Sequence, residues 1–176
     1  DGDQLILTKP IGSGILSSAM KRGMLSNDLL KEFVDYLTAL NKVGELVGEI
    51  ESVNAMTDVT GFGLIGHLNE MTNGSQLTAR LKYSDIPLMN GVKEFAAQMI
   101  YPNNTMRNWK AFNEDVSGIS GESLLTLCDP QTNGGLLIAI RPDGMDDLKK
   151  VFKQAEQSFY HIGELIAYTG KSVEIE

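Results

Sequence analysis

Asp58 stands where a carboxylate could work together with a phosphate-binding turn. The surrounding residues 55–68 read AMTDVTGFGLIGHL. Residues 53–57 include β-branched side chains and no Gly or Pro, which indicates a short strand. After the glycines, positions spaced i, i+3, i+4 and i+7 predict one face of an amphipathic helix, formed by Leu64, His67, Leu68 and Met71. Asp58 is therefore expected at a strand-to-helix turn.

This turn combines groups suited to a phosphate and a divalent cation. A helix N-terminus presents unpaired N–H groups and the positive end of the helix dipole, and Gly61 and Gly63 allow the backbone to approach a ligand closely. An ionised Asp58, flanked by Thr57 and Thr60, can hold a hard cation such as Mg²⁺ beside the phosphates. The structural alternative is that Asp58 or Thr60 only caps the helix, and the segment alone does not decide between the two.

Two more polar turns with glycines carry further candidates. Residues 9–14 (KPIGSG) link a short apolar strand to a helix, and residues 129–135 (DPQTNGG) precede an apolar run. For residues 9–14, tight turning without any ligand is an equally open interpretation. We expect the three turns to open on one edge of a sheet and to form part of a phosphate and metal site that lacks a nucleophile and a general base. The phosphate-cleft candidates are Lys9, Gly12, Ser13, Gly14, Thr57, Thr60, Gly61, Gly63, Asn108, Asp129, Gln131 and Thr132.

Asn108 belongs to a segment, residues 101–114, that has no clear periodicity and is expected to be a long irregular loop. His67 falls on the apolar stripe of its helix, which favours a packing or supporting role. Cys128 has apolar neighbours and no adjacent base, so we expect it to be buried and inert.

Gly61–Gly66 also matches the dinucleotide pattern G-x-G-x-x-G, with Asp85 downstream as the ribose carboxylate. A single match of this kind is weak evidence. The following residues 76–83 alternate polar and apolar, which predicts a strand with one wet face, whereas a central strand of a dinucleotide-binding sheet is apolar on both faces. A dinucleotide-binding module is therefore kept as an alternative behind the phosphate and metal site.

Composition excludes several classes of function. The formal net charge of −8 disfavours non-specific nucleic-acid binding, and no segment has the length of a membrane span or the features of a signal peptide. A single cysteine excludes an internal disulfide and a cysteine-based metal cage. We expect a cytoplasmic protein without nucleic-acid or membrane partners, and the start at Asp1 without Met suggests part of a longer chain.

The order of the expected elements predicts a single domain of the α+β class over residues 1–176. Strands and helices follow one another irregularly, which favours a mixed β-sheet layered with helices over a uniform βαβ ladder. Strands are expected over residues 4–8, 53–57, 76–83, 136–140, 160–168 and 172–175, and helices over 15–22, 27–40, 43–50, 64–73, 92–99 and 146–159.

Three motifs together resemble a known family: LTKPIGSG at 7–14, AMTDVTGFGLIGHL at 55–68 and CDPQTNGGLL at 128–137. Their order and spacing are similar to those in the C-terminal half of selenophosphate synthetases (selenide, water dikinases), within the group that includes aminoimidazole ribonucleotide synthetase. The resemblance covers essentially the whole chain, and Gly66-His67 is specific to the selenium enzymes. Two departures are Asn133, where the family usually has Ser, and residues 103–105, which replace a more glycine-rich turn.

The resemblance implies a fold like the C-terminal domain of aminoimidazole ribonucleotide synthetase and a reaction in which ATP, selenide and water give selenophosphate, AMP and phosphate with Mg²⁺. ATP would lie in a cleft between two domains. The N-terminal domain, absent here, would supply the catalytic Cys or selenocysteine, a Lys and most metal-binding aspartates, and would form a homodimer. Asp58 would be the one metal ligand contributed by this chain, which alone would be inactive. A non-catalytic homologue acting as an interaction domain is a further alternative.

Overall fold

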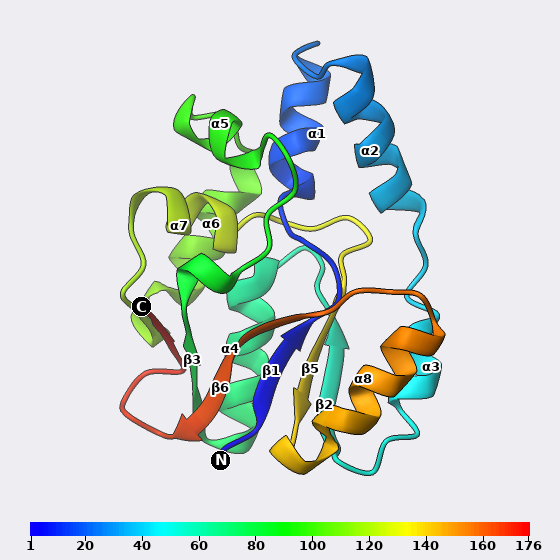
Figure 1. The fold of residues 1–176 in the computed structure, drawn as a ribbon. Coiled ribbons are helices and arrows are strands. Elements are labelled where there is room, and N and C mark those ends of the chain that lie inside the picture. Colours follow the sequence, from blue (N-terminus) through cyan, green and yellow to red (C-terminus); the bar gives the residue numbers. More distant parts are fainter.

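Seven strands form one mixed β-sheet in the order β2-β5-β1-β6-β3-β7-β4 (Figure 1). The computed structural model describes all of residues 1–176. β5 pairs antiparallel with β2 and β1, and β6 pairs antiparallel with β1 and β3, whereas β7 is parallel to both β3 and β4. The strands span Gln4–Leu7 (β1), Val53–Asp58 (β2), Leu77–Leu81 (β3), Val116–Ser117 (β4), Leu136–Ile140 (β5), Tyr160–Ala167 (β6) and Val173–Ile175 (β7).

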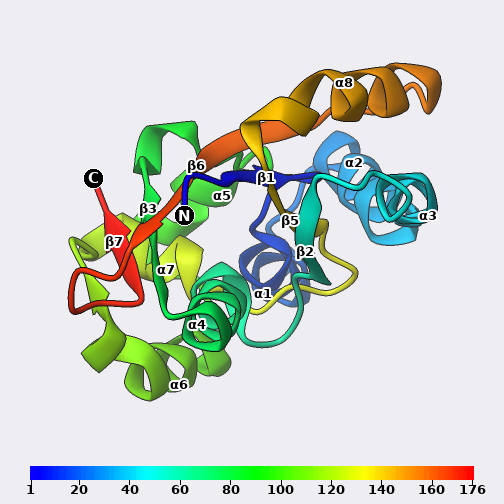
Figure 2. The same ribbon diagram turned by 90° about the horizontal axis from the view of Figure 1, so that it is seen from below.

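Helices cover both faces of this sheet. Figure 2 shows α8 on one face and α4, α6 and α7 on the other. The helices span Ser13–Lys21 (α1), Asn27–Thr38 (α2), Val43–Val47 (α3), Gly63–Ser75 (α4), Val92–Ala97 (α5), Asn103–Phe112 (α6), Gly121–Leu127 (α7) and Met145–Gln154 (α8). The predicted α+β class, a mixed sheet layered with helices, is confirmed.

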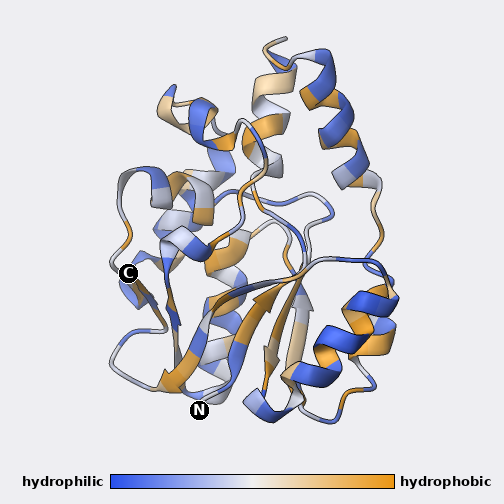
Figure 3. Ribbon diagram, in the orientation of Figure 1, coloured by the Kyte–Doolittle hydropathy of each residue, from blue (hydrophilic) through white to orange (hydrophobic).

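Alternation along the central strands divides the core between the two faces. Leu5 and Leu7 pack into the cluster on the α4 side, whereas Ile6 between them packs into the cluster formed with α3 and α8, because successive side chains of a strand point to opposite faces. All of β5 is buried, which confirms the expectation from its continuous apolar run. Figure 3 shows orange along β1 and β5 and alternating blue and orange along α2 and α8, as amphipathic helices require.

A third cluster lies beyond one edge of the sheet. It joins α1, α2 and α5 around Ile15, Phe33 and Val92, all of which are buried. Ser26 caps α2 as expected, since its hydroxyl accepts from the Leu29 N–H at 3.2 Å. These helices form a helical layer directly above the ends of β1 and β2 (Figure 1).

The expectation of an irregular loop over residues 101–114 is wrong, because Asn103–Phe112 forms α6. Its inner face carries Thr105 and Asn108, both buried, and Trp109 and Phe112 pack against the main core. Because these buried positions are polar, the sequence of α6 lacks the apolar residues at helical spacing that would have predicted a helix. α7 and the short β4 were also not predicted.

Several predicted boundaries also differ from the structure, the most in the last helix, which was expected to reach residue 159 and ends at Gln154. The helix expected to end at Asn73-Gly74 continues to Ser75 and ends with Gln76 in the left-handed region at φ 54°. β3 begins at Leu77 instead of Gln76, and Thr78 on its expected wet face is buried, its hydroxyl bonded to the Lys171 carbonyl.

The topology excludes the dinucleotide alternative. The glycine pattern of a dinucleotide fold lies between two strands that are neighbours in a parallel sheet. Here β2 is an edge strand paired antiparallel with β5, and three strands separate it from β3, the strand that follows α4. No helix is both long enough and apolar enough to cross a membrane.

Candidate functional site

The three glycine-containing turns meet at one edge of the sheet, as expected. β1 and β2 both end there and β5 begins there, because Leu7 pairs with Leu137 and Asp58 pairs with Leu136. Backbone bonds join the turns directly: the Gln131 N–H donates to the Thr60 carbonyl at 2.9 Å. The three segments are therefore one structural unit.

The first and third turns bind each other. Gln131 Oε1 accepts from the N–H groups of Gly12 at 3.0 Å and Ser13 at 3.2 Å, and Asp129 Oδ2 accepts from the Gly14 N–H at 2.9 Å. The Ser13 hydroxyl in turn accepts from the Thr132 N–H at 2.8 Å. The N-terminus of α1 is thus occupied by side chains of the chain itself. Gly12, Ser13, Gly14, Asp129 and Gln131 are all buried, which favours the structural interpretation of residues 9–14.

Asp129 is an internal hydrogen-bond acceptor at this helix end. Burial raises the pKa of Asp129 to about 7, although N–H groups of Ile15 and Gly14 and the Gln131 amide act in the opposite direction. Gly14 has no room for a side chain, because a Cβ there would lie 2.5 Å from Asp129 Oδ1 and 2.6 Å from the Pro130 carbonyl oxygen.

Lys9 faces the C-terminal end of α2. Its Nζ donates to the carbonyls of Ala39 at 2.6 Å and Asn133 at 3.0 Å, and burial lowers the pKa of Lys9. Asn133, in the left-handed region at φ 50°, donates from Nδ2 to the carbonyls of Leu37 and Ala39. A cation and an amide thus satisfy the last carbonyls of the helix, which gives Asn133 a structural role.

The central turn differs because its helix end is open. No side chain caps α4, which contradicts the alternative that Asp58 or Thr60 is its cap. The N–H groups of Gly61, Phe62, Leu64 and Ile65 make no hydrogen bond within the chain. The Asp58 side chain is exposed at the end of β2, immediately before the turn that carries these free donors.

The backbone of this turn is firmly held from the inside. The Thr60 carbonyl accepts from the N–H groups of Gly63 at 3.0 Å and Gln131 at 2.9 Å. Asn108, buried on α6, donates from Nδ2 to the carbonyls of Gly61 at 2.9 Å and Cys128 at 3.0 Å. Asn108 therefore connects the turn to the end of α7 and does not face solvent.

His67 completes the inner support. Its Nε2 accepts from the Thr60 N–H at 3.0 Å and lies 3.1 Å from the Thr60 hydroxyl. The ring is buried, and burial lowers the pKa of His67, opposed by the charges of Glu70 and Asp58. The expectation that His67 packs inside the fold agrees with this position. The sequence pattern did not predict its hydrogen bond to Thr60.

The arrangement suits one half of a magnesium and phosphate site. No three His, Cys, Asp or Glu side chains lie together as a complete metal site. Mg²⁺ is usually held by one or two protein carboxylates together with water and substrate phosphates. Asp58 fits the part of such a carboxylate, and the open end of α4 fits the phosphates.

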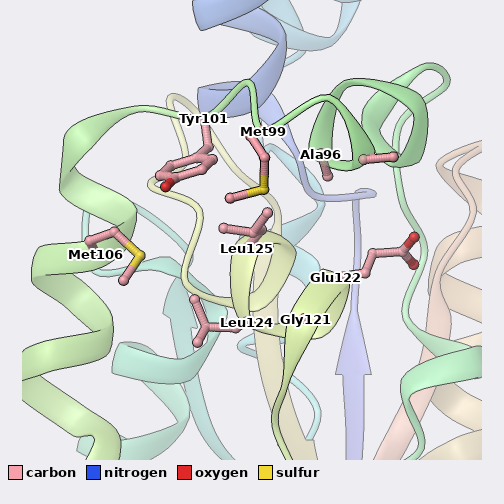
Figure 4. Close-up of a pocket in the computed structure, with 9 residues that line it drawn as sticks. Ala96, Met99, Tyr101, Met106, Gly121, Glu122, Leu124 and Leu125 are labelled. Carbon is pink, nitrogen blue, oxygen red and sulfur yellow. The ribbon is translucent and has the colours of Figure 1, made fainter.

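A groove elsewhere on the molecule has different chemistry. A groove of about 430 Å³ lies among α5, α6 and α7 and is lined mainly by apolar side chains. Figure 4 shows Met99, Tyr101 and Leu125 converging in it, while Glu122 points away. The Glu122 carboxylate accepts from the Tyr83 hydroxyl at 2.9 Å and lies 3.7 Å from Lys93 Nζ. The groove therefore offers no free charge to a phosphate or a metal.

The fold is that of a domain family related to aminoimidazole ribonucleotide synthetase. The family model described as "AIR synthase related protein, C-terminal domain" matches residues 1–176, and the chain belongs to this family.

Particular relatives agree with the resemblance to selenophosphate synthetases. The chain is 40% identical to the selenide, water dikinase of Pseudomonas putida over 174 residues, which is 99% of this chain and 51% of that protein. It is also 40% identical to the enzyme of the same name from Salmonella typhi over 175 residues, covering 99% of this chain and 50% of the relative. The chain thus spans about half the length of the curated relatives it matches.

Solved structures with low sequence identity share the fold. Thiamine-monophosphate kinase from Stenotrophomonas maltophilia superposes with a TM-score of 0.67 at 14% identity, over 99% of this chain and 50% of that one. The hydrogenase maturation protein HypE from Escherichia coli gives 0.69 at 17% identity, over 99% and 46%. A HypE structure described as a complex with ATP gives 0.64 at 18% identity, over 94% and 43%.

Proposed function

We propose that this chain is the C-terminal half of a two-domain selenide, water dikinase and forms one wall of its Mg²⁺–ATP site. In that reaction ATP, selenide and water give selenophosphate, AMP and phosphate. The observation that carries the proposal is the exposed Asp58 carboxylate at the end of β2, in the link that leads to the uncapped N-terminus of α4. The names of the relatives supply the substrate class.

Each group at the open end of α4 has a distinct part in this proposal. Asp58 is a ligand of Mg²⁺, which when bound neutralises developing charge on the phosphates. The free N–H groups of Gly61 and Phe62 donate to phosphate oxygens. Thr57 and Thr60, both half-buried, border the site, and Gly63 holds the backbone between the helix and the end of α7.

The remaining candidates act by holding this wall together. Burial and mutual hydrogen bonds support that role for Gly12, Ser13, Gly14, Asp129, Gln131, and Thr132 through its N–H. Asn108 holds the Gly61 carbonyl, and Lys9 holds the end of α2.

The nucleophile, a Lys and most metal-binding aspartates belong, in this proposal, to an N-terminal domain that also forms the homodimer. The single cysteine, Cys128, is buried, and this supports the absence of a nucleophile from this half. The proposal includes a cytoplasmic location, which the cysteine usage favours. The rival interpretation, a non-catalytic interaction domain, predicts a complete protein without a Cys or selenocysteine upstream.

Replacing Asp58 by Asn in the complete protein tests the proposal. Asn retains the shape of the side chain and loses the charge that a hard cation requires. We expect a near-native melting temperature and a large fall in ATP turnover. The fall should correspond to a loss of more than about 3 kcal/mol in transition-state stabilisation. The measurement is ATP turnover with selenide at several Mg²⁺ concentrations.

Asp85→Asn is the matched control, because Asp85 is an exposed carboxylate outside the site. ATP turnover should be unchanged in this variant. Full turnover by Asp58→Asn would refute the metal role. Loss of folding in Asp58→Asn would make Asp58 a structural residue instead.

A further inference from the structure

Thr60 is the residue through which the Asp58 turn is attached to the rest of the molecule. Its carbonyl accepts two N–H groups, from Gly63 in the same turn and from Gln131 in the third turn. Its own N–H and hydroxyl both face His67 Nε2, at 3.0 and 3.1 Å. Two residues, Val59 and Thr60, lie between Asp58 and the free donors of Gly61 and Phe62. The Val59 N–H donates to the Gly135 carbonyl, so the Thr60 N–H is the only one of the two that a side chain accepts, and that side chain is His67.

The geometry determines which ring nitrogen carries the proton. Nε2 must present a lone pair to accept from the Thr60 N–H, so the neutral ring carries its hydrogen on Nδ1. Nδ1 is buried without a hydrogen-bond partner, and the nearest carboxylate oxygen, Oε2 of Glu70, is 3.8 Å away. That separation is too long for a direct hydrogen bond. The burial that lowers the pKa of His67 maintains the neutral, accepting form.

A neutral acceptor at this place has a consequence for ligand binding. It occupies the Thr60 N–H and leaves the next two, of Gly61 and Phe62, as free donors. It also links Thr60 to the second turn of α4, so a side-chain hydrogen bond joins the turn to the helix whose N-terminus must bind the same ligand. Loss of the acceptor would leave Thr60 bonded only through its carbonyl.

We propose that His67 is a positioning residue, whose Nε2 holds Thr60 and thereby aligns the Asp58 carboxylate with the free N–H groups at the start of α4. This inference rests on the proposed function, because the groups that His67 aligns are those assigned to Mg²⁺ and phosphate. His67 itself is buried, and in this proposal it acts through Thr60 and not by contact with a substrate.

The first test needs no substitution. Long-range ¹H–¹⁵N spectra of the ¹⁵N-labelled 176-residue chain at neutral pH should show His67 with the hydrogen on Nδ1. A hydrogen on Nε2, or a charged ring, would overturn the inference, because neither form accepts from Thr60.

The second test compares three variants. His67→Leu keeps an apolar side chain without an acceptor, and His67→Gln retains an amide oxygen able to accept. Glu70→Gln is the matched control, since it changes the carboxylate beside Nδ1 and leaves the Nε2 bond. We expect hydrogen exchange of the Thr60 amide to accelerate in His67→Leu and to stay near the wild-type rate in the other two. In the complete protein we expect kcat with Mg²⁺–ATP and selenide to fall on the order of 10–100-fold in His67→Leu and to recover largely in His67→Gln.

The outcomes separate this inference from the proposed function. If Asp58→Asn abolishes turnover and folded His67→Leu retains it, the positioning role is refuted and the site stands. If Asp58→Asn retains turnover, the proposed function itself fails. If His67→Leu does not fold, the ring tautomer in the unsubstituted chain and the turnover of His67→Gln still decide, because a folded but inactive His67→Gln would also refute the role of the acceptor.

Discussion

Individual side chains at the sheet edge divide into those that face solvent and those that face each other. The Asp58 side chain is exposed and makes no hydrogen bond, whereas the Asp129 side chain is fully buried and accepts from the Gly14 N–H in the first turn of α1. Both are aspartates in glycine-containing turns, yet only Asp58 is free to take a ligand from outside. The difference arises from what each carboxylate touches: Asp58 faces solvent, and Asp129 is enclosed by the protein. One consequence is that burial raises the pKa of Asp129 to about 7.

Cys128 offers a prediction at this scale. Burial, with a smaller contribution from the charge of Asp129, raises the pKa of Cys128 to about 12. Since the thiolate is the reactive form, the native chain should not react with a thiol reagent at pH 8 and should react fully after unfolding in urea. Rapid reaction of the native protein would show that the helix ends around Cys128 open readily.

The same burial predicts how stability depends on pH. Cys128 and Tyr83 have folded-state pKa values raised to about 12 from ordinary values of 9.0 and 10.0, so the folded state holds these protons more tightly than the unfolded state. Their contribution is complete below the ordinary pKa and is lost as pH rises toward 12. The free energy of unfolding from urea titrations should therefore fall as pH rises through this alkaline range. In Cys128→Ala the free energy of unfolding should fall less steeply with pH than in the unsubstituted chain.

Elements at the site depend on close backbone approach. α4 begins at Gly63, where φ is +70° and an added Cβ would lie 2.9 Å from the Cys128 carbonyl carbon and from the Leu127 oxygen. α4 and the end of α7 can therefore meet only because this residue lacks a side chain. Two positions earlier, Gly61 has open space at the place of a Cβ.

Gly63→Ala should lower the free energy of unfolding by more than about 1 kcal/mol, because backbone atoms cannot yield to the new methyl group and the left-handed conformation disfavours Ala. Gly61→Ala is the control and should change stability by less than about 0.5 kcal/mol, as surface substitutions usually do. Urea titrations of both variants make the comparison. Equal stability of the two would contradict the contact between Gly63 and the end of α7.

Over the whole molecule, the candidate site is an open edge of the sheet. The sheet edge presents a single exposed carboxylate and a set of free N–H groups, and no complete metal site accompanies them. The chain spans about half the length of its curated relatives. A triphosphate with Mg²⁺ needs opposing charge from more than one side.

The isolated chain should therefore bind Mg²⁺–ATP weakly or not at all, and the complete protein should bind it strongly. Calorimetric titration of Mg²⁺–ATP into each makes the measurement, with Asp58→Asn in both as the control. Micromolar binding by the 176-residue chain alone would contradict a site divided between two domains.

The sequence alone was sufficient for most strands, for the central turn and for the family. β1 and β5 are short apolar runs that are almost entirely buried, and β2 alternates between half-buried and exposed side chains. Both patterns are visible in the sequence because they involve only neighbouring residues of one strand. The motif residues 55–68 also placed Asp58 correctly between a strand and a helix.

Only the tertiary structure decided which turn is open. Residues 9–14 and 58–63 are similar in sequence, each a glycine-containing link from strand to helix. The first is filled because side-chain oxygens of Gln131 and Asp129, more than 100 residues away in the chain, accept hydrogen bonds from its N–H groups. The second stays open because Asn108 and His67 hold it only from behind. Hydrogen bonds between distant segments leave no periodic trace in the sequence, so the choice between a cap and a ligand site required the folded chain.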